Sequence, residues 1–210
     1  MATLADILPK LAHWQTDEGR PYKGRLIDWE AHEADPTNIG CMCAQGQALH
    51  LIGGWDFARI RNTDQAVADA ATAVLFGISR AHAVLLRNIN DTAEGAPLIV
   101  LTHPEKVLGS QAQTVLAFWR HLDRMTAKDW DATWVAAWVA AGDAAWDAAW
   151  VAARVAARDA ARDAAGVAAW ASNEIQGARI MRERGQAFYF LPLFGFADPE
   201  SVLAADGEVA

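Results

Sequence analysis

The residues best suited to chemistry lie in the middle of the chain, where Trp150, Arg154, Arg158 and Arg162 recur every four residues. Residues four apart are neighbours on a helix, so the three guanidinium groups would form one row beside the indole ring. Arg154 and Arg158 have no acidic residue three or four positions away. Their charges must be balanced by another segment's carboxylates, by an acidic partner protein or by a small anion such as a nucleotide, because Arg binds such groups through paired hydrogen bonds and Trp adds stacking.

A second candidate site is Cys41-Met-Cys43 with His50 nearby. One intervening residue is shorter than the usual spacing of cysteine ligands in structural zinc sites. If the cysteines precede a helix, its N-terminus would lower the thiol pKa and favour a nucleophile, although no local signature identifies a base. The favoured interpretation is that both thiols pack as small hydrophobic groups. We therefore predict no catalytic residue, metal or cofactor, with Cys41, Cys43 and His50 as the only weak candidates for thiol or zinc chemistry.

The element that would position the Trp/Arg row is a four-residue repeat from Trp130 to Trp170, in tetrads such as DAAW, VAAR and DAAR. Ala and Arg are strong helix formers, and Gly142 and Gly166 keep the register, so we expect one helix from about Ala127 to at least Trp170. A four-residue row drifts about 40° per tetrad around a helix. The Trp ladder therefore cannot face one flat neighbour, and we expect most of its rings to be buried with one or two at a contact surface.

The remaining elements are short. We predict helices at 3–14, 41–52, 63–76, from Ser79 onward, at 110–125 and from Asp198, an ordered loop at 15–40, turns at 88–97, and one strand-like run at 98–101. The aromatic run FYFLPLFGF at 188–196 should pack back on the helices, and the acidic end from Ala205 should fray. The predicted fold is mostly α and a single domain over 1–210, with at most one short strand or hairpin. It comprises short helices and loops (1–125), the long repeat helix (126–185) and an aromatic tail (186–210).

Composition excludes several classes of function. A net charge of −8 over 210 residues argues against general binding of nucleic acid or anionic membranes, which need a basic surface. No segment offers about 20 uncharged apolar residues, and the first residues lack the pattern of a signal peptide. Two cysteines separated by one residue are poorly placed for a disulfide, which fits a reducing cytoplasm.

The tetrads between 131 and 170 resemble the Ala-rich AAW/AAR segments of uncharacterised bacterial and bacteriophage proteins, some of which are named as immunity proteins. The resemblance covers about a fifth of the chain. It implies a small, intracellular, non-catalytic accessory protein and carries over no functional residues.

The leading hypothesis is an intracellular interaction protein, encoded by a phage or bacterium, that acts by binding in immunity or counter-defence. The alternative is a small-molecule binder that holds a nucleotide-like anion on the Trp/Arg row. A virion component and a cysteine-dependent enzyme are further alternatives, and a homo-oligomer is compatible with all of them.

Overall fold

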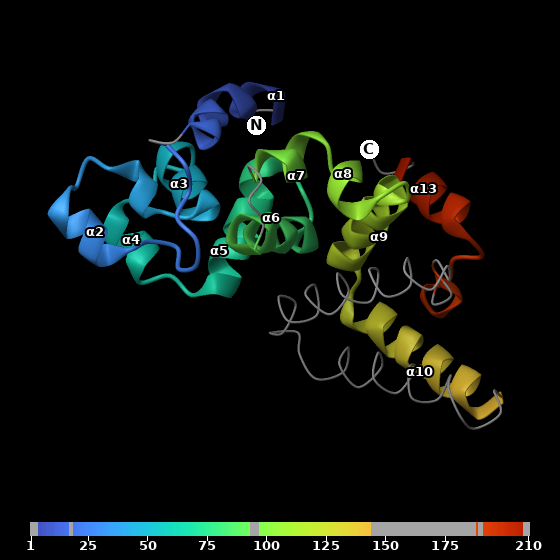
Figure 1. Cartoon of the computed structure of the whole chain (residues 1–210). Coiled ribbons are helices and arrows are strands. Elements are labelled where there is room, and N and C mark those ends of the chain that lie inside the picture. Colours follow the sequence, from blue (N-terminus) through green and yellow to red (C-terminus); the bar gives the residue numbers. More distant parts are fainter. Residues whose placement is uncertain (1–3, 17–18, 93–96, 144–187, 189–190, 208–210) are drawn as a thin grey trace. The chain divides into compact units, whose positions relative to one another are not determined.

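The structure is a computed structural model that describes residues 4–16, 19–92, 97–143, 188 and 191–207. These residues are mostly helical, and the only strand-like pairing among them is an isolated antiparallel bridge between Ile27 and Met42. The prediction of a mostly α fold is confirmed. The chain divides into two compact units, Met1–Ala112 and Gln113–Ala210 (Figure 1). This division does not test the prediction of a single domain over 1–210, which stays a prediction.

The N-terminal unit consists of short helices. In chain order they are α1 (Leu4–Ile7), η1 (Leu8–Gln15), α2 (Trp29–Ala34), η2 (Ile39–Cys41), α3 (Ala44–Leu51), α4 (Phe57–Arg61), α5 (Gln65–Phe76), α6 (Arg80–Thr92), α7 (Leu98–Thr102) and α8 (Glu105–Leu108). The helices α3, α5 and α6 contact one another pairwise (Figure 1). One core cluster contains Leu26, Ile27, Cys41, Met42, Cys43, Leu49, Trp55, Ile60 and Ala68.

The helix boundaries follow local signals in the sequence. Helix α5 follows Asp64 and ends at Gly77, whose φ of 65° is the left-handed conformation that glycine adopts at little cost. Helix α6 follows Ser79, whose hydroxyl accepts a 3.1 Å hydrogen bond from the backbone N–H of His82. The predicted helices at 63–76 and after Ser79 are thus confirmed.

Three local predictions are wrong. The loop predicted at 15–40 contains α2, because the Asp28 carboxylate accepts a hydrogen bond from the Ala31 N–H and starts a helix there. The turns predicted from residue 88 belong to α6, which continues to Thr92. The strand-like run LIVL is helix α7. A short, buried apolar run has the same composition whether it forms a helix or a strand, so composition alone does not distinguish them.

The C-terminal unit has α9 (Ala112–Arg124), α10 (Ala127–Asp143), η3 (Leu191–Phe194) and α13 (Pro199–Gly207) as its described helices. Helix α9 confirms the helix predicted at 110–125, and one of its sides is buried, with Phe118 and Trp119 at most 2% exposed. Phe194 of η3 meets the Phe118 ring edge-on at 5.0 Å and the Trp130 ring at 6.2 Å. The aromatic tail therefore packs back on the helices, as predicted.

The end of the chain differs from its prediction. Helix α13 continues to Gly207, and the Asp206 carboxylate accepts hydrogen bonds of 3.0 Å from the Arg120 Nε. Arg124 Nη2 lies 3.5 Å from the same carboxylate. The predicted fraying therefore does not begin at Ala205, because two arginines of α9 hold the last turn of α13, whereas residues 208–210 lie outside the described residues.

The repeat helix begins as predicted. The Thr126 hydroxyl and the Asp129 carboxylate exchange hydrogen bonds with each other's backbone N–H groups, which is a capping box at the start of α10. Helix α10 continues through Gly142 to Asp143. The rest of the predicted helix, from residue 144 to Trp170, lies outside the described residues.

Within the described ranges, no single helix has the length and apolar character needed to cross a membrane. Only α5 and α6 taken together satisfy that criterion, as a pair bent by 109°.

A candidate binding cleft in the N-terminal unit

The Trp/Arg row that the sequence singled out is not placed by the structure. Its members Trp150, Arg154, Arg158 and Arg162 lie outside the described residues, so the row stays a prediction.

The two thiols are packing groups, as favoured from the sequence. Cys41 and Cys43 are each 2% exposed and belong to the core cluster. Cys43 is the N-cap of α3, and its Sγ accepts a weak hydrogen bond from the Gly46 N–H at 3.5 Å. Burial nevertheless outweighs that bond and raises the pKa of the Cys43 thiol to about 11. The idea that a helix N-terminus activates this thiol is therefore wrong.

His50 does not join the cysteines in a metal site. Its Nδ1 lies 2.7 Å from the Trp55 carbonyl oxygen, with which it shares a hydrogen bond. No group of three or more His, Cys, Asp or Glu side chains in the part of the chain that the structure describes is arranged to hold a metal ion.

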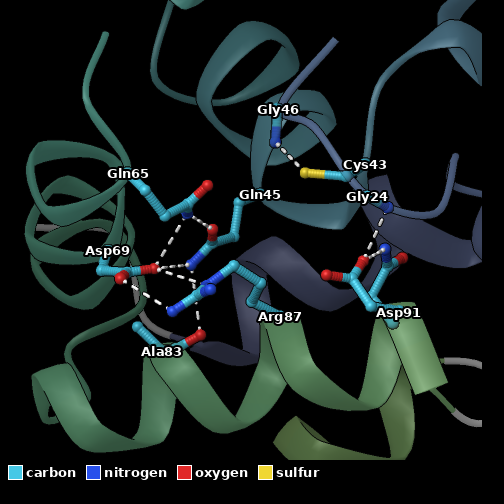
Figure 2. Close-up of polar contacts among 10 residues, drawn as sticks. Gly24, Cys43, Gln45, Gly46, Gln65, Asp69, Ala83, Arg87 and Asp91 are labelled. Carbon is cyan, nitrogen blue, oxygen red and sulfur yellow. Dashed lines mark hydrogen bonds and ion pairs between the residues drawn. The ribbon is translucent and has the colours of Figure 1, made fainter. Parts of the chain in front are cut away.

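A polar network lies inside the helical core (Figure 2). The Gln45 Nε2 donates to Asp69 Oδ1 at 2.8 Å and to the Ala83 carbonyl at 3.1 Å. The Gln65 Nε2 donates to Gln45 Oε1 at 2.7 Å and to Asp69 Oδ1 at 3.1 Å. Arg87 Nη2 lies 3.3 Å from Asp69 Oδ2, and Asp69 is only 2% exposed. The network satisfies a buried carboxylate and fixes the side chain of Gln65.

The middle of the loop between η1 and α2 is hydrogen-bonded to the C-terminal end of α6. The Gly24 N–H donates to Asp91 Oδ1 at 2.9 Å (Figure 2), and Asn90 Nδ2 donates to the Tyr22 carbonyl at 2.8 Å. Gly24 has a φ of 112°, which other L-residues adopt only with strain. These contacts hold the backbone of Tyr22 and Gly24 beside α6.

Two arginines of helix α4 each lie over a tryptophan ring. The Arg59 guanidinium lies 3.7 Å from the centroid of the Trp55 ring, and that of Arg61 lies 4.2 Å from the centroid of the Trp29 ring. Residues two apart project to different sides of a helix, which is why the two arginines reach different rings. Asp56 caps the helix by accepting a 2.7 Å hydrogen bond from the Arg59 N–H.

The ring of Trp29 is held in place by neighbouring side chains. Its Nε1–H donates to Glu33 Oε1 at 2.6 Å, and its ring lies 5.0 Å from that of His32. His32 in turn lies 4.0 Å from Phe57, between ring centroids. The ring on which Arg61 rests is therefore fixed by a column of aromatic side chains.

These parts meet at a cleft of about 790 Å³. It is lined by Tyr22, Arg25, Leu26, Ile27, Asp28, Trp29, Glu30, Ile60, Arg61, Thr63, Asp64 and Gln65. Arg25 and Arg61 are both exposed, and neither forms an ion pair with another of the described residues. The cleft thus offers two guanidinium groups, one of them stacked on a fixed indole ring, to a ligand from solution.

The sequence did not reveal this cleft because its lining comes from two separate stretches of chain, residues 22–30 and 60–65. A signal was present in Trp55-Asp-Phe-Ala-Arg59-Ile-Arg61, where two arginines closely follow a tryptophan. Nothing in the sequence alone indicated that Trp29 would lie beneath Arg61.

No family model matches the chain, and no curated protein or solved structure is significantly similar to it.

Proposed function

We propose that this protein is a non-catalytic interaction protein, and that the cleft beside α4 is where it binds a protein partner. The observation that carries the proposal is the stacking of Arg61 on Trp29 at the cleft wall. Trp, Tyr and Arg are the residue types enriched at the energetic centres of protein interfaces. Tyr22, Trp29 and Arg61 all line the cleft, and contacts within the unit hold the ring of Trp29 and the backbone of Tyr22 in place.

The biological role that we propose is that of an immunity or counter-defence factor, encoded by a phage or a bacterium and acting in the cytoplasm. The AAW/AAR tetrads support this role through their resemblance to proteins named as immunity proteins. The burial of Cys41 and Cys43 disfavours the alternative of a cysteine-dependent enzyme, because a thiol nucleophile needs access and a lowered pKa.

The test is affinity capture from bacterial lysate with three proteins: the wild type, Arg61→Glu and Lys106→Glu. Lys106 is an exposed cation on α8 and does not line the cleft, so its variant repeats the change of charge elsewhere in the same unit. A partner that binds through the cleft should be retained by the wild type and by Lys106→Glu and lost by Arg61→Glu. A partner retained equally by all three would show that the cleft is not the binding site.

The alternative is a small-molecule binder that uses the Trp/Arg row of the repeat for a nucleotide-like anion. It predicts that Arg158→Glu leaves the melting temperature unchanged but abolishes binding of ATP, measured by calorimetry. If Arg158 instead has an internal partner, the same change should lower the melting temperature, because an unpaired charge is left behind.

A further inference from the structure

We infer that the cleft recognises a carboxylate side chain on a segment of the partner protein, seated on Arg25 and Arg61. This inference rests on the proposed function, because it names the chemistry of the same binding site.

Arg61 is held on one wall of the cleft. The Cζ atom of its guanidinium lies over the Trp29 ring, 4.2 Å from the ring centroid. A guanidinium placed over a ring still has N–H donors that a carboxylate can bind. No carboxylate of the described residues pairs with Arg61. An arginine held this way has already lost much of its rotamer freedom, so a carboxylate binds it at a smaller entropic cost than it binds a mobile side chain.

Arg25 and Arg61 differ from other arginines of the chain in their ion pairs. Arg87 and Arg120 each have an aspartate within 3.5 Å, so this chain does supply carboxylates to arginines where the fold needs them. Arg25 and Arg61 line one cleft and have no such partner within the described ranges. Two unpaired cations on one concave surface fit an anionic group from outside.

The acidic residues of the cleft restrict which anion fits. Asp28, Glu30 and Asp64 also line the cleft, and Asp28 is engaged in capping α2. The carboxylates of Asp28, Glu30 and Asp64 repel a multiply charged anion such as a nucleoside triphosphate more strongly than they repel a single carboxylate that approaches the arginines. Small-molecule sites are also mostly apolar, while seven of the twelve residues that line this cleft are charged or polar. A peptide segment with isolated glutamate or aspartate residues is the better match.

The test is a titration followed by ¹H–¹⁵N NMR, reading the indole N–H signal of Trp29, which is assigned by its loss in Trp29→Phe. The probes are an acetylated and amidated eight-residue Gly/Ser peptide with two glutamates, the same peptide with two glutamines, the same with two lysines, and sodium phosphate. We expect the glutamate peptide to shift the signal saturably and to bind about fivefold or more tightly than the glutamine peptide, which corresponds to about 1 kcal/mol for an exposed charge contact. Raising NaCl from 50 to 300 mM should weaken its binding.

The variants Arg25→Gln and Arg61→Gln should each weaken binding of the glutamate peptide about fivefold, whereas Lys106→Gln should leave it unchanged. Melting curves establish that each variant is folded, and Arg25→Gln leaves the Trp29 reporter undisturbed, since Arg25 is not the arginine stacked on that ring. Equal binding of all three peptides, a preference for lysine, or tighter binding of phosphate than of the glutamate peptide would overturn the inference. If a captured partner depends on Arg61 but the three peptides bind equally, the proposed function stands. Only the inference that the partner is recognised through a carboxylate is then overturned.

Discussion

Replacing Asp69 by Asn should destabilise the N-terminal unit strongly. Asp69 is 2% exposed and accepts hydrogen bonds from Gln45, Gln65 and Arg87. The variant keeps the shape of the side chain but removes its charge and turns one acceptor oxygen into an N–H₂ donor that faces other donors. Arg87, whose side chain is 22% exposed, loses its counter-ion.

The magnitude follows from these exposures. Removing one partner of a fully buried ion pair costs about 3–5 kcal/mol. Arg87 is partly exposed and regains some hydration, and Gln45 keeps its hydrogen bond to the Ala83 carbonyl. We therefore expect a loss of about 3 kcal/mol, near the lower end of that range. For a unit of this size the melting temperature should fall by about 10 °C or more.

The assay is urea unfolding followed by far-UV circular dichroism, with Glu105→Gln as the control because Glu105 is an exposed carboxylate in the same unit. A double-mutant cycle with Arg87→Gln isolates the interaction between Asp69 and Arg87. The double variant should be more stable, by about 1 kcal/mol or more, than the sum of the losses of the two single variants predicts. A loss below about 1 kcal/mol in Asp69→Asn, within the range of ordinary surface changes, would refute the reasoning.

Three further predictions concern the core, the C-terminal helix and the thiols. Gly46→Ala should cost about 1–3 kcal/mol in urea unfolding, because the new Cβ would lie 2.2 Å from the Leu26 carbonyl oxygen, whereas Gly207→Ala, with open space around it, should cost nothing. Hydrogen bonding from Arg120 lowers the pKa of Asp206, so this carboxylate contributes stability above its unfolded pKa of about 4 and loses it as pH falls through the lowered value. Asp206→Asn should therefore be less stable than the wild type by about 1 kcal/mol at pH 7, and this difference should shrink as the pH falls below about 4; a difference that does not change with pH would contradict the pairing. Both buried thiols should react with a disulfide reagent at pH 8 only after unfolding, and Cys41→Ser with Cys43→Ser should lower stability but keep partner binding.

The sequence predicted those features that depend on neighbouring residues. The start of the repeat helix at about Ala127 and the helices after Ser79 and at 110–125 all follow from spacing within one turn or two, and all are confirmed. The burial of the Cys41 and Cys43 thiols was also predicted, because a short C-x-C spacing without a matching base fits packing better than chemistry.

The features that the sequence did not predict depend on contacts between distant residues. The run LIVL is helical because tertiary packing, including the hydrogen bond between His82 Nε2 and the Val100 carbonyl, decides the state of a short apolar segment. The pairing of Asp206 with Arg120 joins residues 86 positions apart. The prediction that the chain frays from Ala205 took no account of this distant contact. The cleft likewise brings Trp29 to Arg61 through the fold of α2 and α4.

The most direct test of the account is photo-cross-linking from inside the cleft in bacterial cells. A benzophenone amino acid replaces Thr63, which lines the cleft, and in a control protein it replaces Lys106, which does not. We expect a partner protein to be cross-linked from position 63, not from position 106, and to disappear when Arg61→Glu is added to the first protein. A cross-link from position 106 alone, or one from position 63 that persists with Arg61→Glu, would contradict the claim that this protein works by binding a partner through the cleft.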